Sequence, residues 1–155
     1  MTNPVYSAPL DLVTTAVLTL LRGTGRQVYD GAYAGDPVKP PYPYSILYRI
    51  AGGSSDPFPD LADNPLAVTV AYQLTTVAAH RNQCERAAAA ARDRFLARTR
   101  AGHVHALVLP DGWTDTARRP DPAMPGIDLA GDHPNAIHSQ PQRFYLTVAP
   151  TEETP

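Results

Sequence analysis

The clearest alternation of apolar and polar positions in the chain lies between residues 66 and 75. Every second residue of this segment is large and apolar, while the residues between them are small or polar. The apolar set consists of Leu66, Val68, Val70, Tyr72 and Leu74. Because side chains alternate between the two faces of a strand, this pattern predicts a strand with one face in the core.

A long helix rich in alanine and arginine is predicted directly after this strand. We expect Thr75 or Thr76 to cap its start and Gly102 to end it. The core-facing stripe of this helix is expected to consist of Cys84, Ala88, Ala91 and Phe95. Since most of these residues are small, the helix should approach the sheet closely.

An earlier helix is predicted over residues 9–22. Pro9 suits an early helical position, Asp11 suits the positive start of a helix, and Gly23 supplies a stop. Residues at helical spacing are Leu10, Val13, Val17, Leu20 and Leu21. A second apolar side consists of Leu12, Ala16 and Leu18. This second side predicts a cover formed by a sheet, a loop or another subunit.

Several shorter segments complete the predicted fold. Strands are expected at 27–30, at 44–50, around residues 104–108 and at 144–148. The apolar positions of the last two are Val104, Ala106, Val108, Phe144, Leu146 and Val148. Together the elements predict an α+β fold with two helices packed on a small, mostly antiparallel or mixed sheet of about four to five strands. Because 155 residues is an ordinary domain size, residues 1–155 are expected to form a single domain.

Three long proline-rich segments, 31–43, 51–65 and 110–142, interrupt these elements. The third contains six prolines and little periodicity, so we expect a long arm or binding loop there. Residues 150–155 are expected to be a short flexible tail. The aromatic residues of the three segments include Tyr33, Tyr42, Phe58 and Trp113. Such residues either pack back onto their own domain or anchor a partner, and the sequence leaves both options open.

Net charge is only −2, which argues against a protein whose main affinity is for bulk nucleic acid. Residues 81–100 nevertheless carry six arginines against two carboxylates, a local balance of +4. This arginine face could be solvated, contact another subunit or contact nucleic acid. No apolar run approaches the length of a membrane span, and residues 1–9 lack the pattern of a secretory signal. A soluble protein of the cytoplasm is therefore expected.

Candidate catalytic and metal-binding groups are few. The histidines considered for a metal site are His103, His105, His133 and His138, with Asp132 near the last two. No HExxH motif, cysteine pair or GxSxG motif accompanies them, and the single cysteine, Cys84, falls on the inner face of a helix. We expect no catalytic residue, no metal and no cofactor. A small metal-dependent hydrolase that uses the histidines is the alternative of another class.

Short motifs follow one another in a recognisable order over nearly the whole chain. After the apolar first helix come Val28-Tyr29-Asp30-Gly31, Pro41-Tyr42-Pro43-Tyr44, the strand at 66–75, Arg81-Asn82-Gln83, Pro110-Asp111-Gly112-Trp113 and Phe144-Tyr145-Leu146-Thr147-Val148. In this order and spacing the chain resembles the tail terminator proteins of long-tailed bacteriophages (siphophages), particularly those that infect actinobacteria. The proline-laden 110–142 segment departs from the pattern of that family.

The resemblance implies a structural virion protein, without catalytic residues, that assembles with itself into a ring, expected to be a hexamer. Such a ring caps the tail tube, ends its polymerisation and joins the tail to the head–tail connector or stopper protein at the neck. Its implied partners are further copies of the chain, the major tail tube protein and the connector, and genome DNA would pass through the ring without sequence-specific binding. The implied location is the tail–neck junction of the virion, after assembly in the bacterial host cytoplasm, with no membrane partner. Another head–tail connector or neck completion protein is the nearest alternative.

Ring assembly requires surfaces for the tube, for the neck and for adjacent subunits. We expect the three proline-rich segments to supply them, with the arginine-rich helix near a subunit seam. The candidate interface residues are Tyr33, Tyr42, Phe58, Arg86, Arg92, Arg94, Arg98, Trp113, Arg118 and Arg119.

Overall fold

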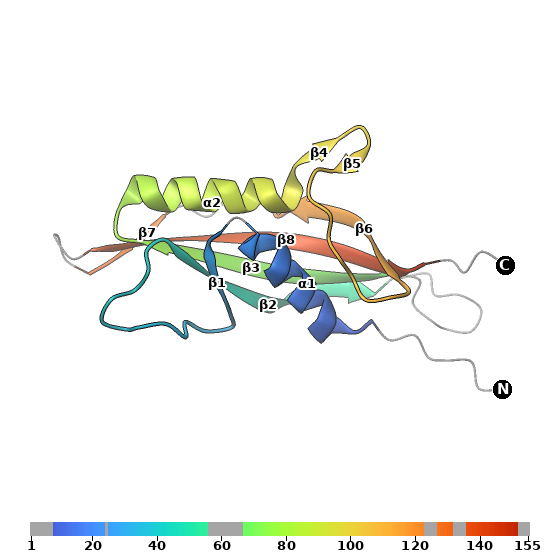
Figure 1. Cartoon of the computed structure of the whole chain (residues 1–155), viewed down its shortest axis with the longest axis horizontal. Helices are drawn as coiled ribbons and strands as arrows, with labels where there is room; N and C mark the ends of the chain where they lie inside the picture. The colour runs from blue at the N-terminus through green and yellow to red at the C-terminus, as the bar shows by residue number, and fades with distance from the viewer. Residues whose placement is uncertain (1–7, 24, 56–66, 123–126, 132–135, 152–155) are drawn as a thin grey trace.

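The computed structural model describes residues 8–23, 25–55, 67–122, 127–131 and 136–151 (Figure 1). Its elements are α1 (Leu10–Arg22), β1 (Gln27–Asp30), β2 (Tyr44–Ser55), β3 (Val68–Ala78), α2 (Arg81–Leu96), β4 (Arg98–Thr99), β5 (Gly102–His103), β6 (Trp113–Pro120), β7 (Asp128–Ala130) and β8 (Ile137–Pro150). Strands β1, β2, β3, β8 and β6 are neighbours in that order, and β7 also pairs with β8. The β1–β2 pair is parallel, and the other pairs of this sheet are antiparallel. The predicted α+β fold is confirmed, and over the described residues the main sheet has six strands where about four to five were expected.

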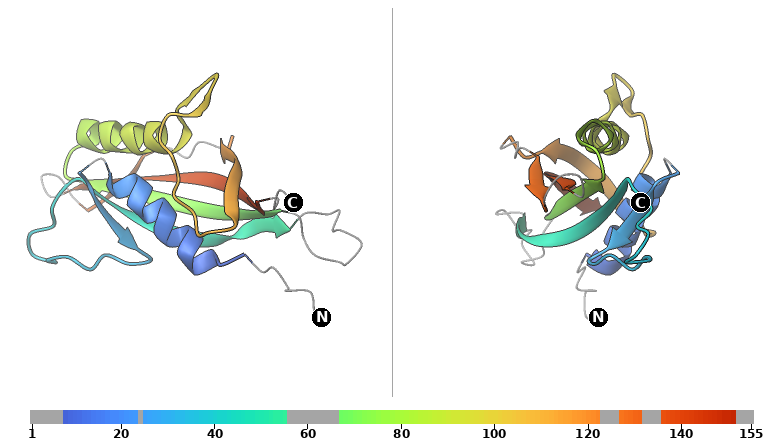
Figure 2. Two further views of the ribbon diagram at one scale, coloured as in Figure 1. Left: turned by 45° about the vertical axis from the view of Figure 1, so that its right-hand side comes forward. Right: turned by 90° about the vertical axis from the view of Figure 1, so that its left-hand side faces the viewer.

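Both helices pack on the same face of the sheet, and the core lies between the helices and the sheet (Figure 2). The alternation predicted for 66–75 and 144–148 is confirmed over the described residues, because Tyr72, Leu74 and Leu146 are almost fully buried on this face. Leu66, the first position of the predicted pattern, lies outside the described residues. Helix α1 is tied to the sheet, since the hydroxyl groups of Thr14 and Tyr72 lie 3.0 Å apart. In the part of the chain that the structure describes, neither helix combines the length and the apolar character needed to cross a membrane.

The stripe predicted for the second helix is buried in full, but the ends of that helix differ from the prediction. Strand β3 continues to Ala78, so Thr76 is a buried strand residue and not a helix cap. Its hydroxyl lies 3.0 Å from that of Ser45. Helix α2 ends at Leu96, and Gly102 instead occupies the short β4–β5 hairpin with φ +123°. Strand β3 extends beyond the residues with the alternating pattern because β2 and β8 continue to pair with it there.

The described part of segment 110–142 is not the long arm or binding loop expected from its prolines, because it contains β6, β7 and the start of β8. Residues 123–126 and 132–135 lie outside the described residues. The N–H of Asp121 donates to the carbonyl of Arg143, and successive residues of a strand direct their backbone groups to opposite sides. Pro120 therefore directs its nitrogen away from β8. Pro141 lies on β8 between the residues that pair with β7 and those that pair with β6, and its nitrogen points to that unpaired side. These prolines remove no hydrogen bond from the ladder, which explains their presence in strands.

Two other loop and strand boundaries also differ from the predictions. The strand expected around 104–108 is absent; β5 ends at His103, and Leu107 turns inward while Val108 is 82% exposed. Residues 51–55, expected in a loop, extend β2, with a register shift between Ile50 and Ser54 that accommodates two glycines. The remainder of the predicted 51–65 loop, from residue 56, lies outside the described residues.

Candidate interaction surfaces

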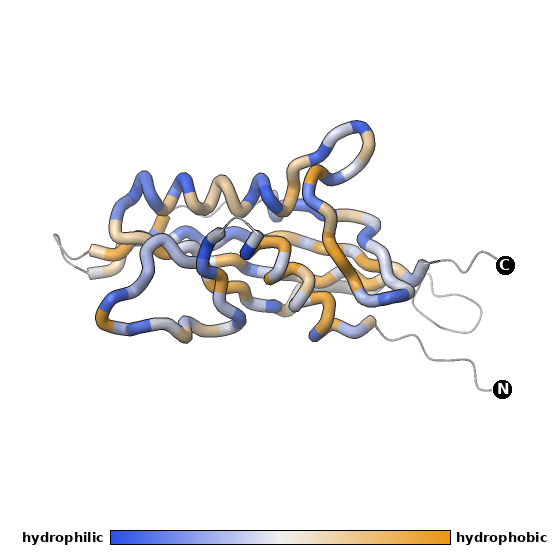
Figure 3. Tube along the Cα trace, viewed as in Figure 1, coloured by the Kyte–Doolittle hydropathy of each residue, from blue (hydrophilic) through white to orange (hydrophobic). Residues whose placement is uncertain are grey.

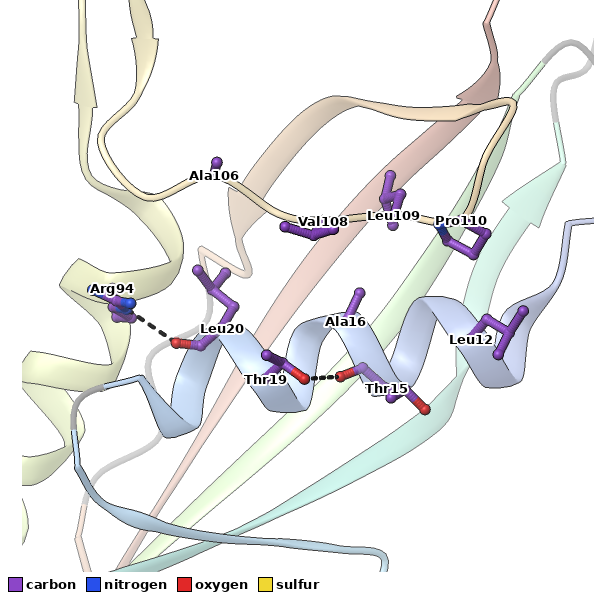
Figure 4. Close-up of a pocket in the computed structure, with 10 residues that line it drawn as sticks. All are labelled: Leu12, Thr15, Ala16, Thr19, Leu20, Arg94, Ala106, Val108, Leu109 and Pro110. Atoms are coloured by element: carbon purple, nitrogen blue, oxygen red, sulfur yellow. Dashed lines mark hydrogen bonds between the residues drawn. The ribbon is translucent and has the colours of Figure 1, made fainter.

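An apolar groove lies between α1 and the extended segment 106–110 that runs alongside it (Figure 4). The groove has a volume of about 480 Å³. Its lining residues are Leu12, Thr15, Ala16, Thr19, Leu20, Arg94, Ala106, Val108, Leu109 and Pro110. Leu12 is 49% exposed, so the second apolar side predicted for the first helix is only partly covered within the subunit.

The threonines of this groove have their hydroxyl groups occupied by the helix itself. Thr15 donates to the carbonyl of Asp11, and Thr19 donates to the carbonyl of Thr15, each at 3.0 Å. A hydroxyl bonded to the preceding turn has little need of an outside partner. The α1 wall of the groove is therefore suited to an apolar guest.

Arg94, a predicted interface residue, holds one end of the groove together (Figure 4). Its Nε donates to the carbonyl of Leu20 at 3.0 Å, which occupies an acceptor in the last turn of α1. Its Nη1 donates to Nδ1 of His105 at 2.8 Å. Arg94 therefore joins α2, α1 and the chain after β5 inside one subunit.

Four tyrosines gather where the 31–43 loop meets β1 and β2. The Tyr33 ring lies 4.6 Å from that of Tyr44 and 5.0 Å from that of Tyr29, and the Tyr42 ring stacks 5.8 Å from Tyr44. Burial among these rings raises the pKa of the Tyr44 hydroxyl above its ordinary value. The two loop tyrosines thus pack back onto their own domain, which anchors the loop on the sheet.

Arg118, a further predicted interface residue, is buried in β6 with only 6% of its surface exposed. Its Nε donates to Asp115 Oδ2 at 2.8 Å, and its Nη1 donates to the carbonyls of His105 at 2.8 Å and Phe95 at 3.3 Å. One guanidinium therefore connects β6, the end of α2 and the segment after β5. The structure assigns Arg118 an internal role in place of the surface role expected from the sequence.

The two histidines of strand β5 and the segment after it, His103 and His105, contact different side chains. His105 accepts from Arg94, whereas Nδ1 of His103 lies 3.7 Å from Asp115 Oδ2. Among the described residues, no three His, Cys, Asp or Glu side chains are placed to hold a metal ion. His138 lies on β8 opposite Leu129 of β7, and Asp132 and His133 lie outside the described residues.

Protonation of His103 is expected to reduce stability in mildly acidic solution. Burial lowers its pKa below the ordinary value of 6.5, and nearby Arg118 acts in the same direction while Asp115 opposes it. As the pH falls below 6.5, the unfolded state takes up a proton before the folded state does, so stability present above pH 6.5 is lost. Thermal unfolding at about pH 7.5 and about pH 5.5 should show a larger loss of Tm for the native chain than for His103→Gln. Equal losses would contradict this role.

The remaining candidate residues are distributed over several elements. Arg86 is exposed on α2, Arg98 is exposed just after α2, and Arg92 is half-buried. The guanidinium of Arg119 is exposed on the helix-free face of the sheet, 4.9 Å from the centre of the Tyr145 ring. Trp113 packs against the core, and Phe58 lies outside the described residues. Partner contacts by this group remain a prediction.

Exposed apolar side chains outside the predicted interface set mark further surfaces. Val38 is 82% exposed in the 31–43 loop, and Leu129 and Ile137 are 62% and 38% exposed on the β7–β8 hairpin. An apolar residue between prolines in a turn was the available signal for Val38. The hairpin gave no such signal, because its pairing became evident only from the fold.

No protein-family model and no curated protein matches the sequence. The fold is nevertheless similar to a chain in the solved virion of a native gene transfer agent particle, with a TM-score of 0.54 and 17% sequence identity. The match covers 96% of this chain and 99% of that chain. The two chains therefore share one fold over nearly their entire lengths.

Proposed function

We propose that this chain is a structural virion protein of a phage-like particle, and that it acts as a tail terminator. The observation that carries the proposal is the end-to-end similarity in fold to a chain of a gene transfer agent virion. Near-complete coverage of both chains indicates that the whole subunit, rather than one common motif, is alike. The order of sequence motifs independently points to tail terminator proteins.

The surfaces of the subunit support a role in assembly. An apolar groove, a tyrosine-anchored loop and an apolar hairpin lie on different parts of the chain. A ring built from identical subunits needs two different complementary surfaces on each copy, and a cap needs others for the tube and the neck. In this proposal the ring stands at the tail–neck junction, after assembly in the host cytoplasm, and DNA passes through it.

The proposed function is tested by adding the purified protein to polymerising tail tube protein from the same genome. We expect a ring-sized species by light scattering and shorter tubes with capped ends by electron microscopy. Tail tube protein of an unrelated phage serves as the control and should not be shortened. A protein that leaves tube length unchanged and instead binds portal or connector proteins would be a neck component, and one that binds neither would contradict the proposal.

A further inference from the structure

Residues 36–39 of the 31–43 loop, which we call the tip, are all exposed, and two hydrogen bonds order the backbone around Val38. The N–H of Val38 donates to Asp36 Oδ1 at 2.8 Å, which closes a turn. The hydroxyl of Tyr33 donates to the carbonyl of Asp36 at 2.7 Å, and the Tyr33 ring belongs to the tyrosine cluster. Because the tip is already ordered, little conformational entropy remains to be lost when it binds.

An apolar side chain with 82% exposure, held on an ordered tip, is suited to a concave apolar site. The groove between α1 and segment 106–110 is such a site, with a volume of about 480 Å³ and its threonine hydroxyls already bonded. Figure 3 shows the apolar stretch along segment 106–110 that forms one wall. The tip and the groove are therefore complementary in polarity.

The charges beside these two surfaces are also complementary. Lys39, the single lysine of the chain, directly follows Val38 and is exposed. Asp11 precedes Leu12 and Asp111 follows Pro110; both carboxylates are exposed, and Leu12 and Pro110 line the same end of the groove (Figure 4). A valine seated in the groove would bring the adjacent ammonium group toward an acidic rim, which favours this orientation.

The tip and the groove of one subunit belong to different parts of its surface. In Figure 1 the 31–43 loop projects at the left-hand end of the molecule, whereas the chain between β5 and β6, which includes segment 106–110, lies on the right-hand side. The tyrosine cluster holds the loop in that position. We propose that Val38 of one copy occupies the α1 groove of a second copy, with Lys39 facing Asp11 and Asp111. This contact rests on the proposed function and would supply the head-to-tail contact of the ring.

Cysteine cross-linking tests the contact on the full chain. Val38→Cys combined with Val108→Cys should give disulfide-linked species larger than a monomer under mild oxidation, since Cys84 is buried and does not compete. Val38→Cys combined with Val104→Cys is the matched control, because Val104 is 53% exposed but lies outside the groove. Absence of linked species, or equal linking of both pairs, would overturn the proposed contact.

Charge reversal gives an independent measurement of the same contact. Lys39→Glu should weaken self-association about fivefold, and combining it with Asp11→Lys and Asp111→Lys should restore most of the loss. Val38→Asp should weaken it about thirtyfold, as expected for a central apolar anchor. Self-association that these changes leave intact overturns the docking but not the proposed function. A chain that stays monomeric even with tail tube protein, and leaves tube length unchanged, overturns both.

Discussion

Replacing Arg118 with alanine is expected to lower the free energy of unfolding by about 3 kcal/mol or more. The change removes the partner of Asp115 and leaves the carbonyls of His105 and Phe95 without their guanidinium donor. Desolvated acceptors without a donor are costly, and the removed side chain also leaves space below Phe95. The effect should therefore greatly exceed that of a typical surface substitution.

Arg119→Ala is the matched control for this prediction, since it removes the same side chain one residue further along β6. Arg119 is exposed and stacks on Tyr145, so its loss should cost about 1 kcal/mol or less. Urea unfolding followed by circular dichroism at equal protein concentration measures both variants, because self-association adds to apparent stability. Similar losses for the two variants would show that the buried bonds of Arg118 contribute little.

The central strand and the two helices could be predicted because their signals are local. Alternation from Val68 to Leu74 and helical spacing from Cys84 to Phe95 each require one buried face, and both patterns are continuous. The ends of these elements could not be predicted equally well. Whether Thr76 caps a helix or extends a strand depends on Ser45 and β2, which are distant in sequence.

The candidate surfaces were predicted less completely, because they join distant segments. Leu12 and Val108 form one groove only because segment 106–110, between β5 and β6, runs beside α1. Counting arginines on a helix does not separate Arg86, which is exposed, from Arg94, which is committed to Leu20 and His105. The prolines of 110–142 led to the wrong prediction of a long loop. A strand can contain a proline whose nitrogen points away from its partner, and the direction of that nitrogen depends on strand pairing, which the sequence does not show.

Phe144→Ala is expected to lower the free energy of unfolding by about 3 to 5 kcal/mol. Phe144 is 2% exposed on β8, and its ring lies 5.1 Å from that of Phe95, which is 1% exposed on α2. The two rings therefore form an aromatic contact between α2 and β8, and truncation of either leaves a cavity that neighbouring side chains only partly fill.

Tyr145→Ala, at the neighbouring position on the helix-free face, is the control and should cost clearly less, because its ring is only partly buried. If the ring pair itself contributes, the double variant Phe95→Ala with Phe144→Ala should lose about 0.5 to 1.5 kcal/mol less than the sum of the single losses. Urea unfolding of the four variants at one protein concentration provides the comparison. Strict additivity would mean that each ring acts through burial alone, and a small loss for Phe144→Ala would contradict the packing of α2 on β8 described above.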